Sequence, residues 1–243
     1  MSSVHVLKSK LIMPELAGGF LLTDRIKSLH KEMDSSKAVA VCAPAGYGKT
    51  TLAVSYFSHR SAASSRICWY RLGTEDRNLS VFIPHLSEAL FPSEADEFVE
   101  SRKALNDCTD IHSQPHNGIS LICREMWTHY SQTCRTRTYI VLDDFQNVAQ
   151  VQDICDMVRY MLDNLPPSCS IFILNRANLN VFTEKQKLEK RILEIDMYDL
   201  SFSSTEIEDL IFIMGQINAD RKLVAIIEKS TEGWIAGIII LFQ

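Results

Sequence analysis

Five short runs of the chain are apolar at nearly every position rather than at alternate ones. They are Ala38–Cys42, Ile67–Leu72, Thr138–Leu142, Ser170–Leu174 and Ile192–Ile195. Strands that read in this way are typical of a parallel sheet that is covered on both faces. The pattern therefore predicts a mainly five-stranded parallel sheet.

Helical spacing occurs between these runs. Three apolar faces are formed by Ile26, Leu29 and Met33, by Phe82, Leu86 and Leu90, and by Val151, Ile154, Val158, Met161 and Leu162. Thr23 or Asp24 is expected to cap the first helix, and Pro166-Pro167 to end the third. Strands that alternate with helices predict βαβ units and a doubly wound α/β fold. The polar stretch 92–118 shows no such pattern and is interpreted as a loop.

The pattern after Asp199 is helical only. Ser203 and Glu206 have the spacing of a capping box, and further helices are expected over 220–229 and from 233 onwards. We therefore predict an α/β domain over 1–200, in which 1–34 form an N-terminal segment and a helix before the first strand. A small helical subdomain follows over 201–243. Because the chain stops inside an apolar helix, this subdomain is expected to be truncated at its C-terminus, as part of a larger protein.

Composition narrows the class of protein. The 243 residues carry a net charge of −5, which argues against a basic nucleic-acid-binding face within this chain. The seven cysteines show no disulfide framework and are expected to be free thiols in a reducing compartment. No secretory leader or membrane-length apolar run is recognisable. These features predict a cytoplasmic protein.

The clearest motif follows the first strand run. Ala43-Pro-Ala-Gly-Tyr-Gly-Lys-Thr50 has the Walker A spacing, with Ala43 where the first glycine usually stands. The motif lies between a strand and a helix, which is the context that a phosphate-binding loop requires. The residues predicted to bind the nucleotide are Pro44, Ala45, Gly46, Tyr47, Gly48, Lys49, Thr50 and Thr51.

Each residue type in this loop suits a phosphate ligand. Gly46 and Gly48 allow the backbone to turn its N–H groups toward phosphate oxygens. Lys49 provides a compact positive charge for the β- and γ-phosphates, and the Thr50 hydroxyl is a hard oxygen ligand for Mg²⁺. Thr51 is a candidate contact for the α-phosphate. The loop predicts a P-loop NTPase that binds a nucleoside triphosphate with Mg²⁺.

Two carboxylates end the third strand run. Asp143 is predicted to hold Mg²⁺ and Asp144 to orient or deprotonate the attacking water. The alternative for Asp144 is an acid on a solvated turn. Arg176 ends the fourth strand run, where it either contacts the γ-phosphate or is a surface arginine. Arg25 either covers the nucleotide or is a plain charge on a helix surface. Lys49, Asp143, Asp144 and Arg176 form the predicted catalytic set.

Two further groups carry weaker signals. Cys108, His112 and His116 are spaced four residues apart, but Pro115 interrupts the pattern and a polar loop is favoured over a metal site. The three tryptophans are interpreted as packing residues of the core or of the subdomain: Trp69, Trp127 and Trp234.

The ordered series of motifs resembles the nucleotide-binding domain of the maltose-regulator-like activators. These are LuxR-type bacterial transcription regulators among the signal-transduction ATPases with numerous domains (STAND), a branch of the AAA-like ATPases. The resemblance covers nearly the whole chain. Its motifs are Lys10–Pro14, Leu21–Arg25, Ala43–Thr51, Cys68–Leu72 with Glu75-Asp76, Leu142–Phe145, Leu174–Arg176, Asp199–Ser203 with Glu206, and Glu232–Gly237.

The resemblance implies an ATP/ADP switch. ADP is expected to hold a closed monomer, and ATP with an inducer to favour a self-associating form. DNA binding would belong to a C-terminal module outside this chain. Slow, Mg²⁺-dependent ATP hydrolysis would control the switch. Two alternatives stay open: a P-loop phosphotransferase such as a small-molecule kinase, and a scaffold that holds ADP without hydrolysing it. No membrane partner is expected.

Overall fold

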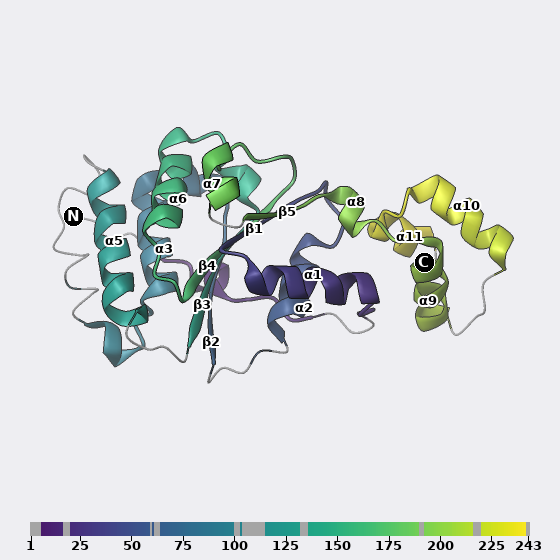
Figure 1. The fold of residues 1–243 in the computed structure, drawn as a ribbon, viewed down its shortest axis with the longest axis horizontal. Helices are drawn as coiled ribbons and strands as arrows, with labels where there is room; N and C mark the ends of the chain where they lie inside the picture. The colour runs from purple at the N-terminus through teal and green to yellow at the C-terminus, as the bar shows by residue number, and fades with distance from the viewer. Residues whose placement is uncertain are drawn as a thin grey trace.

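A computed structural model describes residues 6–16, 20–58, 60, 64–99, 103, 115–131, 136–189, 192–215 and 220–241. Within these residues, five strands form one sheet in the order β2-β3-β4-β1-β5, and all neighbouring strands are parallel (Figure 1). The strands are β1 (Ala38–Cys42), β2 (Ser65–Arg71), β3 (Arg137–Asp143), β4 (Cys169–Asn175) and β5 (Ile192–Ile195). All five predicted strands are confirmed.

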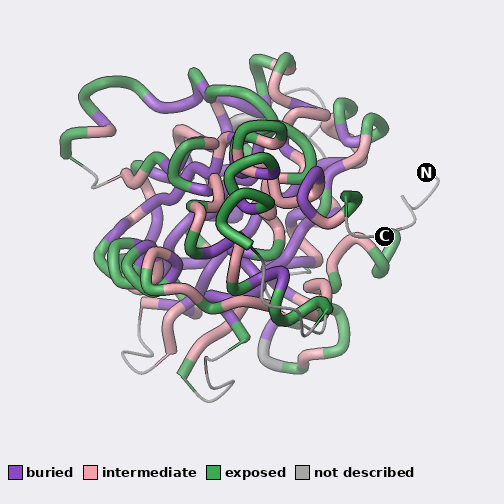
Figure 2. Tube along the Cα trace, turned by 90° about the vertical axis from the view of Figure 1, so that its right-hand side faces the viewer, coloured by how far each residue is buried: buried purple, intermediate pink, exposed green. Residues whose placement is uncertain are grey.

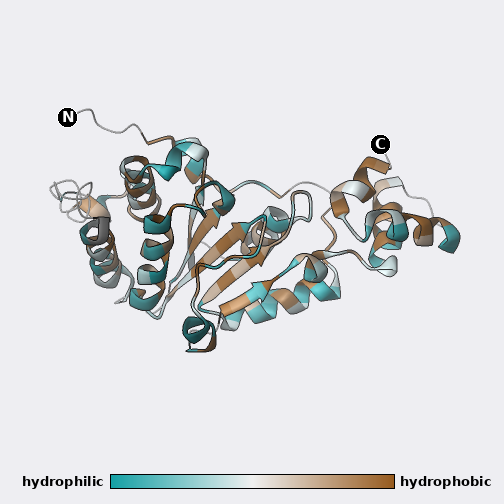
Figure 3. Ribbon diagram, turned by 90° about the horizontal axis from the view of Figure 1, so that it is seen from above, coloured by the Kyte–Doolittle hydropathy of each residue, from teal (hydrophilic) through white to brown (hydrophobic). Residues whose placement is uncertain are grey.

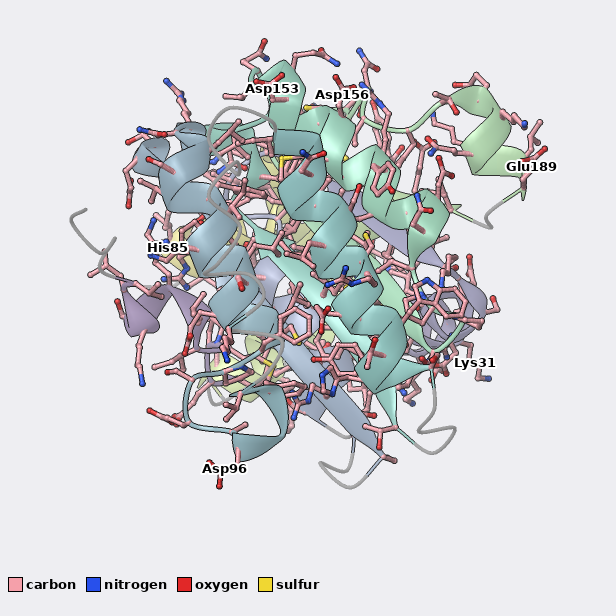
Figure 4. The ribbon with its side chains drawn as sticks, turned by 90° about the vertical axis from the view of Figure 1, so that its left-hand side faces the viewer. Lys31, His85, Asp96, Asp153, Asp156 and Glu189 are labelled. Atoms are coloured by element: carbon pink, nitrogen blue, oxygen red, sulfur yellow. The ribbon has the colours of Figure 1, made fainter. Side chains whose placement is uncertain are left out.

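Helices cover both faces of the sheet, as the doubly wound prediction requires. One face packs against α3 (Leu79–Leu90), α5 (Pro115–Tyr130) and α6 (Gln152–Asn164). Figure 4 views the molecule from the side of these three helices. The other face packs against α1 (Asp24–Ser35) and α2 (Lys49–Ser58). Alternate residues of one strand serve the two cores, as Val39 and Ala40 of β1 illustrate. Buried positions concentrate inside these layers (Figure 2).

The predicted helix limits have direct physical causes. The Thr23 hydroxyl accepts the Ile26 N–H at 3.3 Å, which identifies Thr23 rather than Asp24 as the N-cap of α1. α6 ends at Asn164, immediately before Leu165 and the two prolines. Pro115 is the first residue of α5, where its missing N–H leaves no helical bond unmade.

Several elements were not predicted. Within the stretch interpreted as a loop, the structure shows the 3₁₀ turn η3 (Asp96–Phe98) and the first turn of α5. The structure also shows α7 (Glu184–Glu189) and α8 (Met197–Leu200). Trp69 is buried as expected, but the prediction for Trp127 is wrong: this residue is 44% exposed on α5. Its indole N–H donates to the Asn164 carbonyl at 2.6 Å.

A buried aspartate ties the N-terminal segment to the sheet. Asp76 in the turn η2 (Thr74–Arg77) is fully buried and accepts hydrogen bonds from Tyr70 Oη at 2.7 Å and Lys10 Nζ at 2.6 Å. Lys10, in η1 (Lys8–Leu11), also pairs with Glu75 at 2.6 Å. A buried carboxylate needs such partners, because an unpaired one is strongly disfavoured. Two separate motifs of the sequence, around Lys10 and around Asp76, thus meet in one network.

The C-terminal helices form a core of their own. α9 (Ser204–Gly215), α10 (Arg221–Thr231) and α11 (Ile235–Leu241) lie beyond the end of the sheet (Figures 1 and 3). Their shared buried residues are Ile207, Leu210, Ile211, Val224, Ile227 and Ile238. The predicted capping box is present, since the Ser203 N–H donates to Glu206 Oε2 at 3.0 Å and Ser203 Oγ accepts the Glu206 N–H at 3.4 Å.

Two properties of the described part of the chain bear on its surroundings. No helix there has both the length and the apolarity needed to cross a membrane. Five of the cysteines are free thiols: Cys42, Cys68, Cys123, Cys155 and Cys169.

Candidate functional site

The loop between β1 and α2 has the backbone shape that its glycines predict. Gly46 and Gly48 both adopt left-handed conformations, with φ of 81° and 82°. These angles favour glycine over residues with a Cβ. Ala43 is 1% exposed, and its N–H donates to the Asn175 carbonyl at 3.2 Å, so it extends the pairing of β1 with β4. An alanine therefore fits where the first Walker A glycine usually stands.

Lys49 lies at the centre of the site. Its ammonium group donates to the carbonyl oxygens of Ala43 at 2.7 Å and Pro44 at 2.9 Å. Burial and then the nearby guanidinium of Arg176 lower the pKa of Lys49, while the carboxylates of Asp144 and Asp143 act in the opposite direction. Lys49 thus lies within electrostatic reach of the other three residues predicted to be catalytic.

Thr50 and Asp143 bring the two sequence motifs together. Thr50 Oγ1 donates to Asp143 Oδ1 at 3.3 Å, although the two residues are 93 positions apart in the sequence. Asp143 is 2% exposed. Burial, followed by the charge of Asp144, raises the pKa of the Asp143 carboxyl. The Thr50 hydroxyl at the start of α2 and the Asp143 carboxylate at the end of β3 are hard oxygen donors that suit Mg²⁺, so the residues present fit this cation.

Asp144 is held in an unusual conformation. Its φ of 57° is left-handed, which aspartate and asparagine tolerate better than most residues. Its N–H donates to Asp143 Oδ1 at 2.9 Å, and its Oδ1 accepts Gln146 Nε2 at 2.8 Å. The carboxylate is therefore oriented by a neighbour, as a general base requires.

The strand order explains why residues from three strands converge. β4 lies between β1 and β3, so the carboxyl ends of the three strands lie side by side at one edge of the sheet. Arg176 follows this end and is exposed. Sequence reasoning missed Arg71, which is paired in register with Asp143 and places Nε 3.8 Å from Asp143 Oδ2. In the sequence, the place of Arg71 at the end of a strand run was the feature that could have indicated this position.

An apolar cavity of about 330 Å³ lies beside the loop. Tyr47 and Thr51 line it from the loop side and Arg25 from α1. The apolar lining comes from Phe20, Leu21, Ile26, Leu52, Leu200, Phe202, Leu210, Ile235, Ala236 and Ile239. The residues of the loop and this cavity together fit a nucleotide, with polar N–H groups for phosphates and apolar walls for a base.

Arg25 has a partner that neither sequence interpretation included. Its Nε donates to Glu206 Oε1 at 3.0 Å, and another guanidinium nitrogen donates to the Asp199 carbonyl. Arg25 therefore connects α1 to the start of α9, at the rim of the cavity. Hydrogen bonds from Ser203 and Arg25 hold the pKa of Glu206 below its ordinary value, although burial acts in the opposite direction.

The short helix α11 and the residue before it, Trp234, also contact the loop, which sequence reasoning missed. Trp234 Nε1 donates to the Ala45 carbonyl at 2.9 Å, and the Ala236 N–H donates to the Gly46 carbonyl at 3.1 Å. The Glu232–Gly237 motif was the signal for this contact, but nothing in its residue types specifies the loop as partner.

The rejected metal motif stays untested. The side chains of Cys108, His112 and His116 lie outside the described residues. Among the side chains that are described, no cluster of three or more His, Cys, Asp or Glu residues forms a metal site.

Comparison with known proteins supports the assignment of the loop. Residues 18–176, more than half of the chain, match the family model described as Nephrocystin 3, N-terminal. The chain belongs to this family. The matched part of this nephrocystin 3 N-terminal domain contains the loop, Asp143, Asp144 and Arg176.

Curated relatives confirm the resemblance to maltose regulators. The chain is 24% identical to the HTH-type transcriptional regulator MalT of Vibrio parahaemolyticus over 93% of its own length. It is 22% identical to the serine/threonine-protein kinase PknK of Mycobacterium tuberculosis, also over 93% of its length. The chain spans 24% of the MalT relative and 20% of the PknK relative.

Solved structures confirm the predicted P-loop NTPase fold. Cdc6p from Pyrobaculum aerophilum superposes with a TM-score of 0.54 at 13% identity, over 99% of this chain and 65% of that one. A Walker-type ATPase of Pyrococcus abyssi gives 0.52 at 11% identity, over 95% of this chain and 70% of that one.

The buried Asp143 carboxylate is expected to reduce the stability of the fold without ligand. Because its pKa is raised, the folded state binds the proton more tightly than the unfolded state does. The stability that this proton contributes is present below the ordinary aspartate pKa of 3.8. It is lost as the pH rises through the higher pKa that Asp143 has in the folded state. We therefore predict that Asp143→Asn melts at or above the wild-type Tm at pH 7 without Mg²⁺, and loses the Mg²⁺-dependent part of ADP stabilisation. Melting curves at pH 4 to 7 check this, and a lower Tm for the variant at pH 7 contradicts it.

Proposed function

We propose that this chain is the ATP/ADP-binding switch domain of a signal-responsive, STAND-type transcription regulator. The observation that carries the proposal is the contact between Thr50 and Asp143, beside the Lys49 ammonium. It joins a phosphate-binding loop to an acidic strand end, the pairing that phosphoryl-transfer sites need. The relatives named as transcriptional regulators support the regulatory part of the proposal.

The proposed nucleotide position follows from the chemistry of the walls. The phosphates bind at residues 44–51, where backbone N–H groups and Lys49 complement negative charge. The base enters the apolar cavity beside Tyr47, with Arg25 at its rim. Adenine suits this lining better than guanine, because guanine carries more polar edge groups that the apolar walls leave unpaired.

The proposed hydrolytic chemistry divides between the charged residues. Thr50 and Asp143 hold Mg²⁺, which supplies charge neutralisation at the phosphates when bound. Lys49 and Arg176 hold positive charge where phosphate charge develops, and Asp144 accepts the proton of the attacking water. The Gln146 contact keeps the Asp144 carboxylate oriented. Hydrolysis is expected to be slow, because its purpose in a switch is timing.

The proposed switch joins the sheet to the helical part of the chain. The resemblance supports a closed ADP form and an ATP form that self-associates, with DNA bound only through a module outside this chain. Moving a two-state population from 1:99 to 99:1 needs about 5.5 kcal/mol of differential binding. Contacts to one further phosphate and to Mg²⁺ are of the right size to supply much of it. The proposal places the protein in the cytoplasm, which the free thiols support.

A radiolabelled ATP assay separates this proposal from its alternatives. The chain is incubated with γ-³²P-ATP and Mg²⁺, with and without small-molecule acceptors, and the labelled products are resolved. Slow release of phosphate to water is the expected result. Transfer of the label to an acceptor would instead support a P-loop phosphotransferase such as a small-molecule kinase. Bound but uncleaved ATP would support a scaffold that holds nucleotide without hydrolysing it.

A further inference from the structure

Trp234, just before α11, and Ala236, in the first turn of α11, contact two successive carbonyl groups of the phosphate-binding loop. Trp234 donates to the Ala45 carbonyl, and the Ala236 N–H donates to the Gly46 carbonyl. In a trans peptide, the C=O of one residue and the N–H of the next point in opposite directions. Holding these two carbonyls toward α11 therefore directs the N–H groups of Gly46 and Tyr47 to the opposite side of the peptide planes.

Trp234 is itself firmly placed. The backbone N–H of Trp234 donates to the Thr231 carbonyl at 2.9 Å, and the carbonyl of the preceding Gly233 accepts the Phe202 N–H at 3.0 Å. The indole ring lies against Gly237, where an added Cβ would stand 2.5 Å from Trp234 Cε3. A side chain at position 237 would displace the ring. The indole N–H is thus a directed donor rather than a loosely held one.

The same approach leaves no room for a side chain on the loop. A Cβ built on Gly46 would lie 2.6 Å from both Trp234 Nε1 and the Ala236 methyl group. α11 also contributes Ile235, Ala236 and Ile239 to the apolar cavity. One short helix therefore borders both the loop and the cavity.

We infer that Trp234 is a positioning residue of the phosphate cradle, which links nucleotide affinity to the docking of the helical subdomain. This inference rests on the proposed function. Phosphate groups bind best when the loop N–H groups are already aligned, and the Trp234 bond aligns one of them. By linkage, a nucleotide that needs this alignment stabilises the docked position of α11 by the same free energy.

The test compares two tryptophan variants in the whole 243-residue chain. Trp234→Phe removes the indole N–H and keeps an aromatic ring at the position. Trp127→Phe is the matched control, because Trp127 also donates its indole N–H to a backbone carbonyl, that of Asn164. Dissociation constants for ADP and for adenosine are measured by calorimetric titration with Mg²⁺ present. Ligand-free melting curves of the two variants establish that both are folded.

We expect ADP to bind roughly 3- to 10-fold more weakly to Trp234→Phe, the loss appropriate to one neutral hydrogen bond. Trp127→Phe should bind ADP as the unsubstituted chain does. Adenosine carries the base without phosphates, so its affinity should be equal in all three proteins. A general disturbance of the cavity would instead weaken adenosine and ADP alike.

Three results of these titrations would overturn the inference. Equal ADP affinity in the two variants removes Trp234 from the cradle, and parallel loss of adenosine binding shows a merely structural role. Absence of ADP binding by the unsubstituted chain overturns the proposed function and this inference with it. If Trp234→Phe fails to fold, the tryptophan emission of the Trp127→Phe variant is measured instead. ADP should change this emission and adenosine should not. Equal emission changes with the two ligands would contradict the inference.

Discussion

The Lys49→Ala variant is expected to lose tight binding of ATP and ADP while the fold survives. The ammonium is the compact positive charge at the loop, and charge-assisted contacts to phosphate are worth about 1.5–3 kcal/mol. Affinity should therefore fall roughly 10- to 100-fold or more. The fold should not suffer, because the lowered pKa of Lys49 shows that burial disfavours its charged form.

Melting curves with and without Mg²⁺-ADP measure this effect. At about 100 times the dissociation constant, ADP should raise the wild-type Tm by roughly 5–10 °C. At the same concentration, a 100-fold weaker variant should shift by less than about 2 °C. Lys31→Ala is the matched control, because Lys31 is an exposed lysine on α1 (Figure 4). A wild-type shift in Lys49→Ala would exclude the loop from nucleotide binding.

Asp144→Asn is expected to bind nucleotide normally and to lose hydrolysis. Asparagine tolerates the left-handed conformation at this position, and its amide oxygen still accepts the bond from Gln146. It cannot accept the proton of the attacking water. General-base catalysis typically contributes about 10²- to 10⁴-fold, so turnover should fall by that factor.

The measurement is phosphate release under single-turnover conditions, alongside the ADP-induced Tm shift. Asp153→Asn serves as control, since Asp153 is exposed on α6, which covers the opposite face of the sheet from α2 (Figure 4). Unchanged turnover in Asp144→Asn would assign the base role to another group. Loss of both binding and turnover would indicate that Asp144 supports the loop rather than the reaction.

The sheet was predictable because its strands are buried on both faces. Uniform apolar runs such as that of β4 leave little alternative to a central parallel strand. α5 was missed because the polar stretch before it carries no period and Pro115 was interpreted as a break. At the first position of a helix a proline is favourable, so the same residue marks a start. Trp127 was misassigned because aromatic size favours burial on average, whereas position on the helix decides it.

The site was predictable wherever strand topology alone brings residues together. Thr50 and Asp143 each belong to a motif with a known place at the carboxyl edge of a parallel sheet. The partner of Arg25 and the loop contact of Trp234 depend instead on how the C-terminal helices pack against the α/β part. Residue spacing within either segment does not indicate how the two segments pack together, so only the three-dimensional structure shows these contacts.

The loop at residues 43–51 is expected to bind adenine nucleotides. The most direct test of this binding is a thermal melt of the chain, stripped of bound nucleotide, with ADP, ATP or GTP and Mg²⁺. We predict a rise of roughly 5–10 °C with either adenine nucleotide at about 100 times its dissociation constant, and a smaller rise with GTP. No shift with any of the three nucleotides would contradict the account.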